Sequence, residues 1–399
     1  MKILPKVKNL ICITSHPKGC KENIATSVRY IKKHTNYTKE KKTILIIGAS
    51  TGYGLATRLV ATFGYKAKTI GIIHEKQNKK TKPATAGWYN TAFLEHVAKK
   101  NNIYAKSINI DAYSQEAKIK VIEIIKKELS GKIDLLFYSI ASSKRYDQKT
   151  NKTYKSSLKP VDTIYKCKTL DIYNKKLKTT IIEPATKDEI NNTIKVMGGE
   201  DWEIWINYLI KENVLNENFK TIAYSYNGSK ITNKIYKNGT IGLAKKNLKK
   251  IMYNLNKKLT KKCNGRAYIS INTATLTQAS IAIPTVSLYI PILNKILKKK
   301  YIYENSIDQI LKLFKLINNK KTLPNIIRLD NFELREDIQY KINLILKKIN
   351  TKTLNKYLNL EETKIEFYKL FGFANRKINY SLDSNINILI PSIINKTKN

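Results

Sequence analysis

Short apolar runs rich in β-branched residues alternate with amphipathic segments along much of the chain. The runs lie at 43–47, 69–73, 103–109, 133–138 and 221–226. Between them, apolar positions recur every three or four residues, which is the spacing of one helix face. This strand–helix alternation predicts an α/β fold with a doubly wound, mainly parallel sheet flanked by helices and joined by right-handed crossovers.

The amphipathic segments predict helices at 22–34, 55–64, 87–100, 117–129, 184–195, 199–211 and 240–263. In the fourth of these, Ile119 is expected on the inward face. Residues 7–14 are expected to form a further strand that leads into a turn at His16–Gly19. Residues 143–185 are polar and irregular, which indicates a loop or a small hairpin inserted over the sheet.

A glycine-rich turn joins the first apolar run to its helix, with the sequence Gly48-Ala49-Ser50-Thr51-Gly52-Tyr53-Gly54. Gly48 permits a tight turn, and the two later glycines let the backbone approach a ligand closely. The N–H groups that open the following helix suit the pyrophosphate of a dinucleotide. The spacing differs from G-x-G-x-x-G, and an ordinary strand-to-helix turn without a ligand is the alternative.

The second apolar run ends at His74-Glu75, and Glu75 lies 21 residues after Gly54. A carboxylate at about this distance accepts hydrogen bonds from the adenosine ribose in dinucleotide-binding folds. It also repels a 2′-phosphate. The pattern therefore favours NADH over NADPH.

The carboxyl ends of parallel strands share one edge of a sheet, where ligands bind. We therefore expect Asp111-Ala112 and Ser139-Ile140, which follow the third and fourth runs, to lie beside the glycine turn. Asp111 could accept a hydrogen bond from an adenine amine. It is equally suited to be a turn residue or a helix N-cap.

The net charge of +44 suggests a nucleic-acid or anionic partner at first sight. The surplus is nearly all lysine, scattered along the chain together with abundant Asn and Ile, and all three residues have A/T-rich codons. Mutational bias therefore explains it better than a nucleic-acid site, which usually draws on arginine. A basic surface would still attract anionic substrates.

The four cysteines and four histidines form neither a zinc pattern nor a disulfide framework, so no metal is expected. The amino-terminal residues do not resemble a signal peptide, and no apolar run approaches 20 residues. These features predict a cytoplasmic protein without membrane insertion.

After the apolar run at 221–226 the chain offers a phenol, Tyr236, and an ammonium, Lys245. A nearby cation stabilises phenolate, lowers the pKa of the tyrosine and can donate to a ribose hydroxyl. Residues nine apart lie half a turn out of phase on one helix, so Tyr236 must precede the regular helix. Asn238-Gly239 supplies the break, and Thr240 is the expected N-cap. Lys246 is an alternative for the lysine role, and a solvated lysine pair is the simpler interpretation.

Several segments together resemble the FabV-type enoyl-acyl-carrier-protein reductases, also called trans-2-enoyl-CoA reductases. These segments are 48–54, 85–90, 104–108, 197–202, Tyr236-x8-Lys245 and 277–280. The likeness extends from residues 4–20 to 371–373, which is nearly the whole chain.

The resemblance implies one enlarged Rossmann domain over 1–399, similar to short-chain dehydrogenases, which acts as a monomer and uses NADH. Its parts would be 1–40, 41–145, 146–235, 236–300 and 301–399. The implied reaction reduces the trans-2 double bond of an enoyl thioester, on coenzyme A or acyl-carrier protein, at the end of fatty-acid elongation. The alternatives are another Rossmann-fold oxidoreductase and, less favoured, a basic nucleic-acid-binding protein.

By the same resemblance, Tyr236 would donate the proton, Lys245 would contact the nicotinamide ribose, and Tyr226 would bind the thioester. NADH would be held by Gly48, Ala49, Ser50, Thr51, Gly52, Tyr53, His74, Glu75, Asp111, Ala112, Ser139, Ile140, Lys245, Thr275, Leu276 and Thr277. The family usually has Phe in place of His74 and Trp in place of Lys237.

The most apolar stretch, Ala279–Leu293, is expected to form a helix over the active site. Its Ile281, Ile283, Val286, Leu288 and Tyr289 would wall an acyl channel, and plain core packing is the alternative.

Overall fold

Seven parallel strands form one central sheet in the computed structural model, which describes residues 1–8, 11–35, 42–278, 280, 283–319 and 322–393. Across the sheet the order is β13 (Ile326–Arg328), β12 (Arg266–Ile271), β11 (Leu215–Ser225), β6 (Ile133–Tyr138), β3 (Thr43–Ile47), β4 (Lys68–Ile73) and β5 (Ala105–Asn109). β3, the first strand of this sheet along the chain, lies inside it between β6 and β4, and the strand order reverses beside it. The predicted doubly wound parallel sheet is confirmed.

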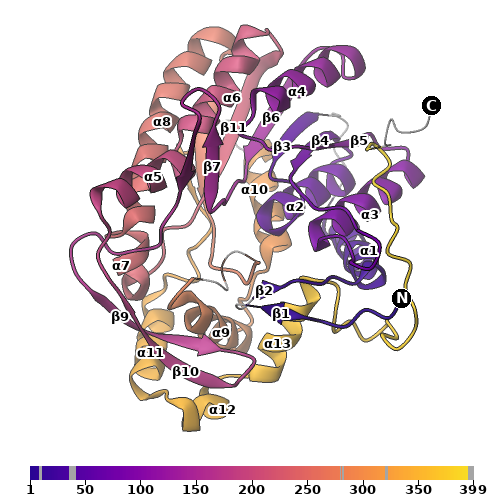
Figure 1. Ribbon diagram of the computed structural model, residues 1–399. Coiled ribbons are helices and arrows are strands. Elements are labelled where there is room, and N and C mark those ends of the chain that lie inside the picture. Colours follow the sequence, from indigo (N-terminus) through magenta and orange to yellow (C-terminus); the bar gives the residue numbers. More distant parts are fainter. Residues whose placement is uncertain (9–10, 36–41, 279, 281–282, 320–321, 394–399) are drawn as a thin grey trace.

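Helices cover both faces of the sheet because side chains of a strand point to alternate sides. In β3, Ile44 and Ile46 pack with one set of helices, namely α1 (Pro17–His34), α2 (Gly52–Leu59), α3 (Ala86–Lys100) and α10 (Ser306–Asn319). Leu45 and Ile47 pack with the other set, namely α4 (Gln115–Glu128), α6 (Glu200–Lys211) and α8 (Thr240–Cys263). Figure 1 shows the two sets on opposite sides of the strands.

A third hydrophobic cluster lies beyond the sheet and contains Ile235, Tyr236 and Ala274 from segments that follow β11 and β12. Most of its other members come from α9 (Val286–Lys299), α11 (Glu336–Lys348), α12 (Leu354–Tyr357) and the antiparallel hairpin β9 (Tyr165–Asp171) with β10 (Lys176–Ile182). These elements form the lower part of Figure 1. They therefore stand over the sheet edge where a ligand is expected.

Further elements are the hairpin β7 (Lys144–Asp147) with β8 (Lys152–Lys155), helix α5 (Lys187–Met197), the short helix α7 (Asn233–Tyr236) and helix α13 (Leu360–Lys369). No helix among the described residues combines the length and the apolar character that a membrane crossing requires.

Four local expectations from the sequence are wrong. Residues 7–14 form no single strand, because β1 (Val7–Lys8) pairs antiparallel with β2 (Ile11–Cys12) in a small hairpin apart from the sheet. The expected turn at His16–Gly19 belongs instead to the start of α1, where Pro17 is tolerated because the first helical N–H groups have no partners. Ile119 is 44 % exposed, because it lies well off the face that Ala117 and Val121 define.

The fourth concerns the apolar stretch 279–293. Helix α9 begins only at Val286 and continues to Lys299, with Pro291 inside it. Residues 279, 281 and 282, and with them the expected channel residue Ile281, lie outside the described residues. Residues 143–185, predicted to form a loop or a small hairpin over the sheet, form two hairpins, and β9 packs against α9 rather than over the sheet.

Candidate active site

The glycine-rich turn stands at the carboxyl end of β3 and is held in a conformation that requires glycine. Gly48 has φ +84°, and a Cβ there would lie 2.3 Å from the carbonyl oxygen of Ser139, which follows β6. A Cβ on Gly54 would lie 1.8 Å from the carbonyl oxygen of Gly48. The turn can therefore close tightly only without side chains at these two positions.

The amino terminus of α2 is open. Its N-cap Thr51 makes no side-chain capping bond, so the N–H groups of the first turn are not satisfied by a cap. The partial positive charge of a helix amino terminus favours an anion there. A Cβ on Gly52 would lie 3.7 Å from the methyl carbon of Thr277, which brings the loop after β12 to the same place.

Glu75 follows β4 beside this turn. Its two carboxylate oxygens accept hydrogen bonds from Ser50 Oγ at 2.6 Å and Thr85 Oγ1 at 2.5 Å. Asn109 Oδ1 accepts a bond from the Glu75 backbone N–H at 2.8 Å. Each carboxylate oxygen has a second lone pair, so the fixed carboxylate can still accept from ribose hydroxyls. The neighbouring His74 is exposed.

The loop after β5 forms a closed turn. Asp111 Oδ1 accepts a hydrogen bond from the Tyr113 N–H at 3.0 Å, and Ser114 is the N-cap of α4. Asp111 is therefore a turn residue in this structure, which is one of the alternatives that the sequence analysis gave for it. Its second carboxylate oxygen is the one available to a ligand.

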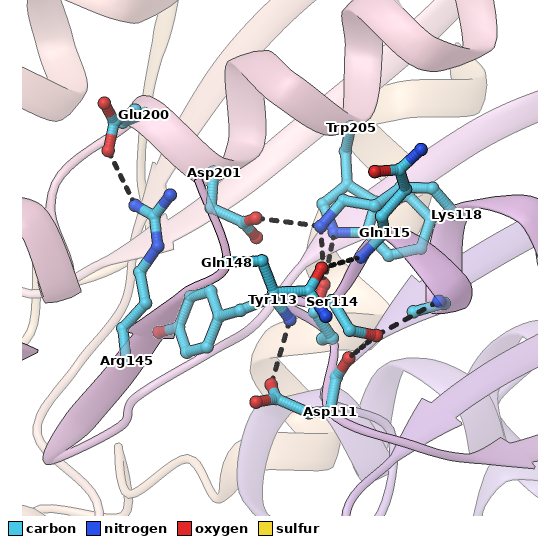
Figure 2. A network of polar contacts seen from close by, with 12 residues as sticks. Asp111, Tyr113, Ser114, Gln115, Lys118, Arg145, Gln148, Glu200, Asp201 and Trp205 are labelled. Carbon is cyan, nitrogen blue, oxygen red and sulfur yellow. Dashed lines mark hydrogen bonds and ion pairs between the residues drawn. The ribbon is translucent and has the colours of Figure 1, made fainter. Parts of the chain in front are cut away.

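A buried polar network holds this loop from behind (Figure 2). The carbonyl oxygen of Ala112 accepts bonds from Lys118 Nζ at 2.7 Å and from Trp205 Nε1 at 3.1 Å. Lys118 also forms an ion pair with Asp201 at 3.0 Å, and the hydroxyl of Tyr138 donates to the same carboxylate. The side chains of Lys118 and Asp201 are 2 % and 3 % exposed, so this pair is removed from water.

Burial lowers the pKa of Lys118 and raises that of Asp201, while the ion pair opposes both shifts. Arg145, which also lies near Asp201, forms its own ion pair with Glu200 at 2.7 Å (Figure 2). The network thus joins α4, α6, β6 and β7 behind the position expected for the adenine.

The loop after β12 contains Thr275, Leu276 and Thr277, all half-buried. Thr277 and Ser280 exchange hydrogen bonds between backbone N–H and hydroxyl groups, and Ser280 Oγ also donates to the Thr275 carbonyl at 2.9 Å. The hydroxyl of Tyr53, from α2, lies 2.7 Å from the carbonyl oxygen of Thr273. These bonds fix the loop against the glycine turn.

Tyr236 ends the short helix α7, and α8 begins at Thr240, so the predicted break at Asn238-Gly239 is confirmed. Gly239, not Thr240, is the N-cap. The Thr240 hydroxyl instead donates to the Ser157 carbonyl at 2.5 Å. This bond ties the start of α8 to the insertion.

Lys245 makes no direct contact with Tyr236: among the described residues it forms no hydrogen bond or ion pair with the phenol. Burial, together with the negative charge of Glu333, raises the pKa of Tyr236 instead of lowering it. The phenol therefore keeps its proton at neutral pH, as a proton donor must.

Lys245 is half-buried, and burial lowers its pKa to about 8. Lys246 is exposed, which favours Lys245 over its neighbour for a role at the site. A half-buried ammonium without an ion-pair partner among the described residues suits the hydroxyls of a bound ribose.

Tyr226 packs edge-on against Tyr236, with ring centroids 4.6 Å apart and an interplanar angle of 88°. Its hydroxyl donates to Glu333 Oε1 at 2.7 Å. Glu333 is fully buried and also accepts from the Tyr289 hydroxyl at 2.8 Å and from the Ala274 N–H at 2.7 Å. Leu288 and Tyr289, expected to wall an acyl channel, are fully buried in the third cluster.

The sequence analysis missed Glu333. It lies five residues after the edge strand β13. The rule that the carboxyl ends of parallel strands share an edge would find it, but only if β13 could be recognised as a strand from the sequence. That strand has only three residues, Ile326–Arg328, and this is too short for a periodic pattern. Among the described residues, no group of His, Cys, Asp and Glu side chains is arranged to hold a metal ion.

Three family models match the chain. Residues 2–80 match the NAD(P)H binding domain of trans-2-enoyl-CoA reductase, and residues 82–317 match the trans-2-enoyl-CoA reductase catalytic region. Residues 324–383 match a model described as an enoyl reductase FAD binding domain.

Relatives match over nearly the full length. The chain is 44 % identical over 398 residues to an enoyl-(acyl-carrier-protein) reductase (NADH) of Coxiella burnetii, covering 98 % of both chains. It is 42 % identical over 397 residues to a trans-2-enoyl-CoA reductase (NADH) of Ruminiclostridium cellulolyticum, covering 98 % of this chain and all of the relative.

Solved structures agree with this. A crystal structure of Clostridium acetobutulicum trans-2-enoyl-CoA reductase in complex with NADH has a TM-score of 0.93 and 39 % identity, covering 98 % of this chain and 99 % of that one. The Treponema denticola trans-2-enoyl-CoA reductase in complex with NAD has a TM-score of 0.91 and 39 % identity, covering 96 % and 98 %.

The residues of 324–383, all of them described, do not fit a flavin. They contain one strand, β13, which belongs to the central sheet, and so no strand–turn–helix–strand unit of their own. Their one glycine is Gly372, where a Cβ would lie 2.4 Å from the carbonyl oxygen of His16. This glycine faces α1 and cannot cradle a phosphate, so we derive no step through a flavin.

Proposed function

The chain belongs to the family of trans-2-enoyl-CoA reductases, and we propose that it reduces the trans-2 double bond of enoyl thioesters with NADH. The observation that carries the proposal is the Tyr226–Tyr236 pair, which stands over the sheet edge that holds the glycine turn. The substrate is an enoyl thioester of coenzyme A or acyl-carrier protein, and the product is the acyl thioester at the end of a fatty-acid elongation cycle.

The dinucleotide is held along the carboxyl edge of the sheet. Its pyrophosphate lies at the open amino terminus of α2, beside the loop of Thr275, Leu276 and Thr277. Glu75 accepts from the adenosine ribose, and the turn of Asp111 and Ala112 borders the adenine. Lys245 donates to the nicotinamide ribose.

Bound NADH supplies the hydride that adds to C3 of the substrate. Negative charge then develops on the thioester oxygen as an enolate, and the hydroxyls of Tyr226 and Tyr236 donate hydrogen bonds to it. Donors fixed where charge appears stabilise the transition state, each contributing about 3 kcal/mol. Tyr236, whose raised pKa keeps it protonated, then provides the proton that C2 receives.

The apolar third cluster, which surrounds Tyr236, keeps water from this charge and strengthens the two hydrogen bonds. We propose that the enzyme acts as a monomer in the cytoplasm. The insertion and the third cluster are then parts of one enlarged Rossmann domain.

Isotope labelling tests the reaction. With crotonyl-CoA and NADH deuterated at the nicotinamide C4, the account predicts one deuterium at C3 of the butyryl product when the transferred hydrogen is labelled. With unlabelled NADH in D₂O, it predicts one deuterium at C2. Deuterium from the cofactor at C2, or a reduced carbonyl in the product, would contradict the proposed chemistry.

A further inference from the structure

Glu333 is a buried carboxyl group that the proposed chemistry does not use. Its side chain is 0 % exposed and lies in the loop after β13, directly behind Tyr226. Oε2 accepts from the backbone N–H of Ala274 at 2.7 Å. Oε1 accepts from the hydroxyls of Tyr226 at 2.7 Å and Tyr289 at 2.8 Å. A charge this deep in the protein costs free energy unless it is well hydrogen-bonded.

A phenol has one proton to donate. When Tyr226 donates its proton to the Glu333 carboxylate, the Tyr226 oxygen faces the substrate only as an acceptor. An enolate oxygen is itself an acceptor, so the two would repel one another. In the arrangement that the structure records, Tyr226 cannot stabilise the enolate.

Protonation of Glu333 reverses the direction of one hydrogen bond. The proton must be on Oε1, because Oε2 faces the N–H of Ala274. The Tyr289 oxygen already accepts from Gln339 Nε2 at 3.0 Å, whereas Glu333 is the one hydrogen-bond partner of the Tyr226 hydroxyl among the described residues. Protonated Oε1 therefore donates to Tyr226, and the proton of Tyr226 becomes available to the substrate.

We propose that Glu333 is a positioning residue whose protonation turns the Tyr226 hydroxyl from the protein toward the thioester oxygen, so that the protonated form is the active one. The inference rests on the proposed function, because it assumes that Tyr226 binds the thioester. It adds a control of that residue by a carboxyl group that does not touch the substrate.

The surroundings of Glu333 place its titration in the physiological range. Burial raises the pKa of Glu333 to about 7. The hydrogen bonds that Glu333 accepts oppose this shift, whereas the negative charge of nearby Asp330 adds to it. The titratable groups that face it from other elements are the phenols of Tyr53, Tyr226, Tyr236 and Tyr289. On its own segment, Arg328 forms an ion pair with Asp330 at 2.7 Å. The active form therefore dominates below pH 7 and is lost above it.

The test compares the pH dependence of kcat/KM for crotonyl-CoA, at saturating NADH, in the wild type and in Glu333→Gln. The amide of Gln can accept from Ala274 and donate to Tyr226, which copies the protonated carboxyl group. Each pH unit above the pKa lowers the protonated fraction tenfold. The ratio of variant to wild type is expected to rise about tenfold from pH 6 to pH 8.

The titration of Lys245, whose pKa is about 8, affects both proteins and cancels in this ratio. A ratio that stays constant from pH 6 to pH 8 would overturn the inference. Should Glu333→Gln fail to fold, Tyr289→Phe serves instead. It removes one hydrogen bond to the carboxylate without touching Tyr226, so the fall in kcat/KM is expected to move to higher pH. An unmoved profile there also overturns the inference.

Tyr226→Phe separates this inference from the proposed function. The account expects it to lose about 100-fold or more in kcat at pH 6 while binding NADH normally. If Tyr226→Phe is as active as the wild type, the proposed role of Tyr226 fails. If it is impaired but the Glu333→Gln ratio stays constant, the control by Glu333 fails and the proposed function stands.

Discussion

Replacing Lys118 by Met tests the buried network behind the adenine side of the site. The substitution leaves the Asp201 carboxylate, 3 % exposed, without its ion-pair partner, although the Tyr138 hydroxyl still donates to it and Arg145 lies near it. Removing one partner of a buried pair costs about 3–5 kcal/mol, because the remaining charge is desolvated without compensation. That is a large part of the roughly 5–15 kcal/mol that stabilises a folded protein.

The assay is urea unfolding followed by tryptophan fluorescence, to which Trp205, with its ring centroid 4.7 Å from Lys118 Nζ, contributes locally. The matched control is Lys118→Met combined with Asp201→Asn. It removes the unpaired charge but keeps an acceptor for Tyr138, so it should regain more than half of the lost free energy of unfolding. A single variant within about 1 kcal/mol of the wild type would refute the reasoning.

The same pair of variants separates stability from cofactor binding. In both, the carbonyl oxygen of Ala112 keeps Trp205 as a donor but loses Lys118. We therefore expect KM for NADH to rise several-fold in both variants, with kcat little changed. Recovery of KM together with stability in the double variant would show that the network supports the fold alone.

Two further predictions concern single groups. Glu75→Ala should raise KM for NADH and reduce the preference for NADH over NADPH, because it removes the acceptor for the ribose hydroxyls and the charge that repels a 2′-phosphate. Steady-state kinetics with both cofactors measure this. An unchanged preference for NADH would exclude the ribose-binding role of Glu75. Burial lowers the pKa of His16 to about 4, so between pH 6.5 and pH 4 the His16 imidazole is protonated in the unfolded chain but not in the folded one. The free energy of unfolding should therefore fall by up to about 3 kcal/mol from pH 6.5 to pH 4, and it should fall less in His16→Gln. Unfolding curves at several pH values test this, with the exposed His34→Gln as control.

Five of the seven strands of the central sheet were predictable, because most of them are buried on both faces and therefore form short apolar runs. The other two, β12 and β13, were not predicted from the sequence. The break between Tyr236 and the long helix was predictable too, because Asn238-Gly239 carries its own local signal. The amino-terminal hairpin was not: its strands have two residues each, and periodicity cannot show so short an element.

The site residues that the sequence missed depend on contacts between distant segments. Lys118 belongs to a helix rich in lysine and gives no local sign of being buried against Asp201, 83 residues away. Glu333 meets Tyr226 across 107 residues, through a strand too short to recognise. Local patterns indicate elements and turns, whereas the pairing of buried charges is decided only when the chain packs.

The most direct test of the central claim is NADH oxidation with crotonyl-CoA by the wild type, by Tyr236→Phe and by Tyr253→Phe, an exposed tyrosine on α8 that serves as the control. The account predicts turnover by the wild type and the control. It predicts a loss of about 100-fold or more in kcat for Tyr236→Phe, with NADH binding unchanged. A wild type that binds NADH but turns over no enoyl thioester, or a fully active Tyr236→Phe, would contradict it.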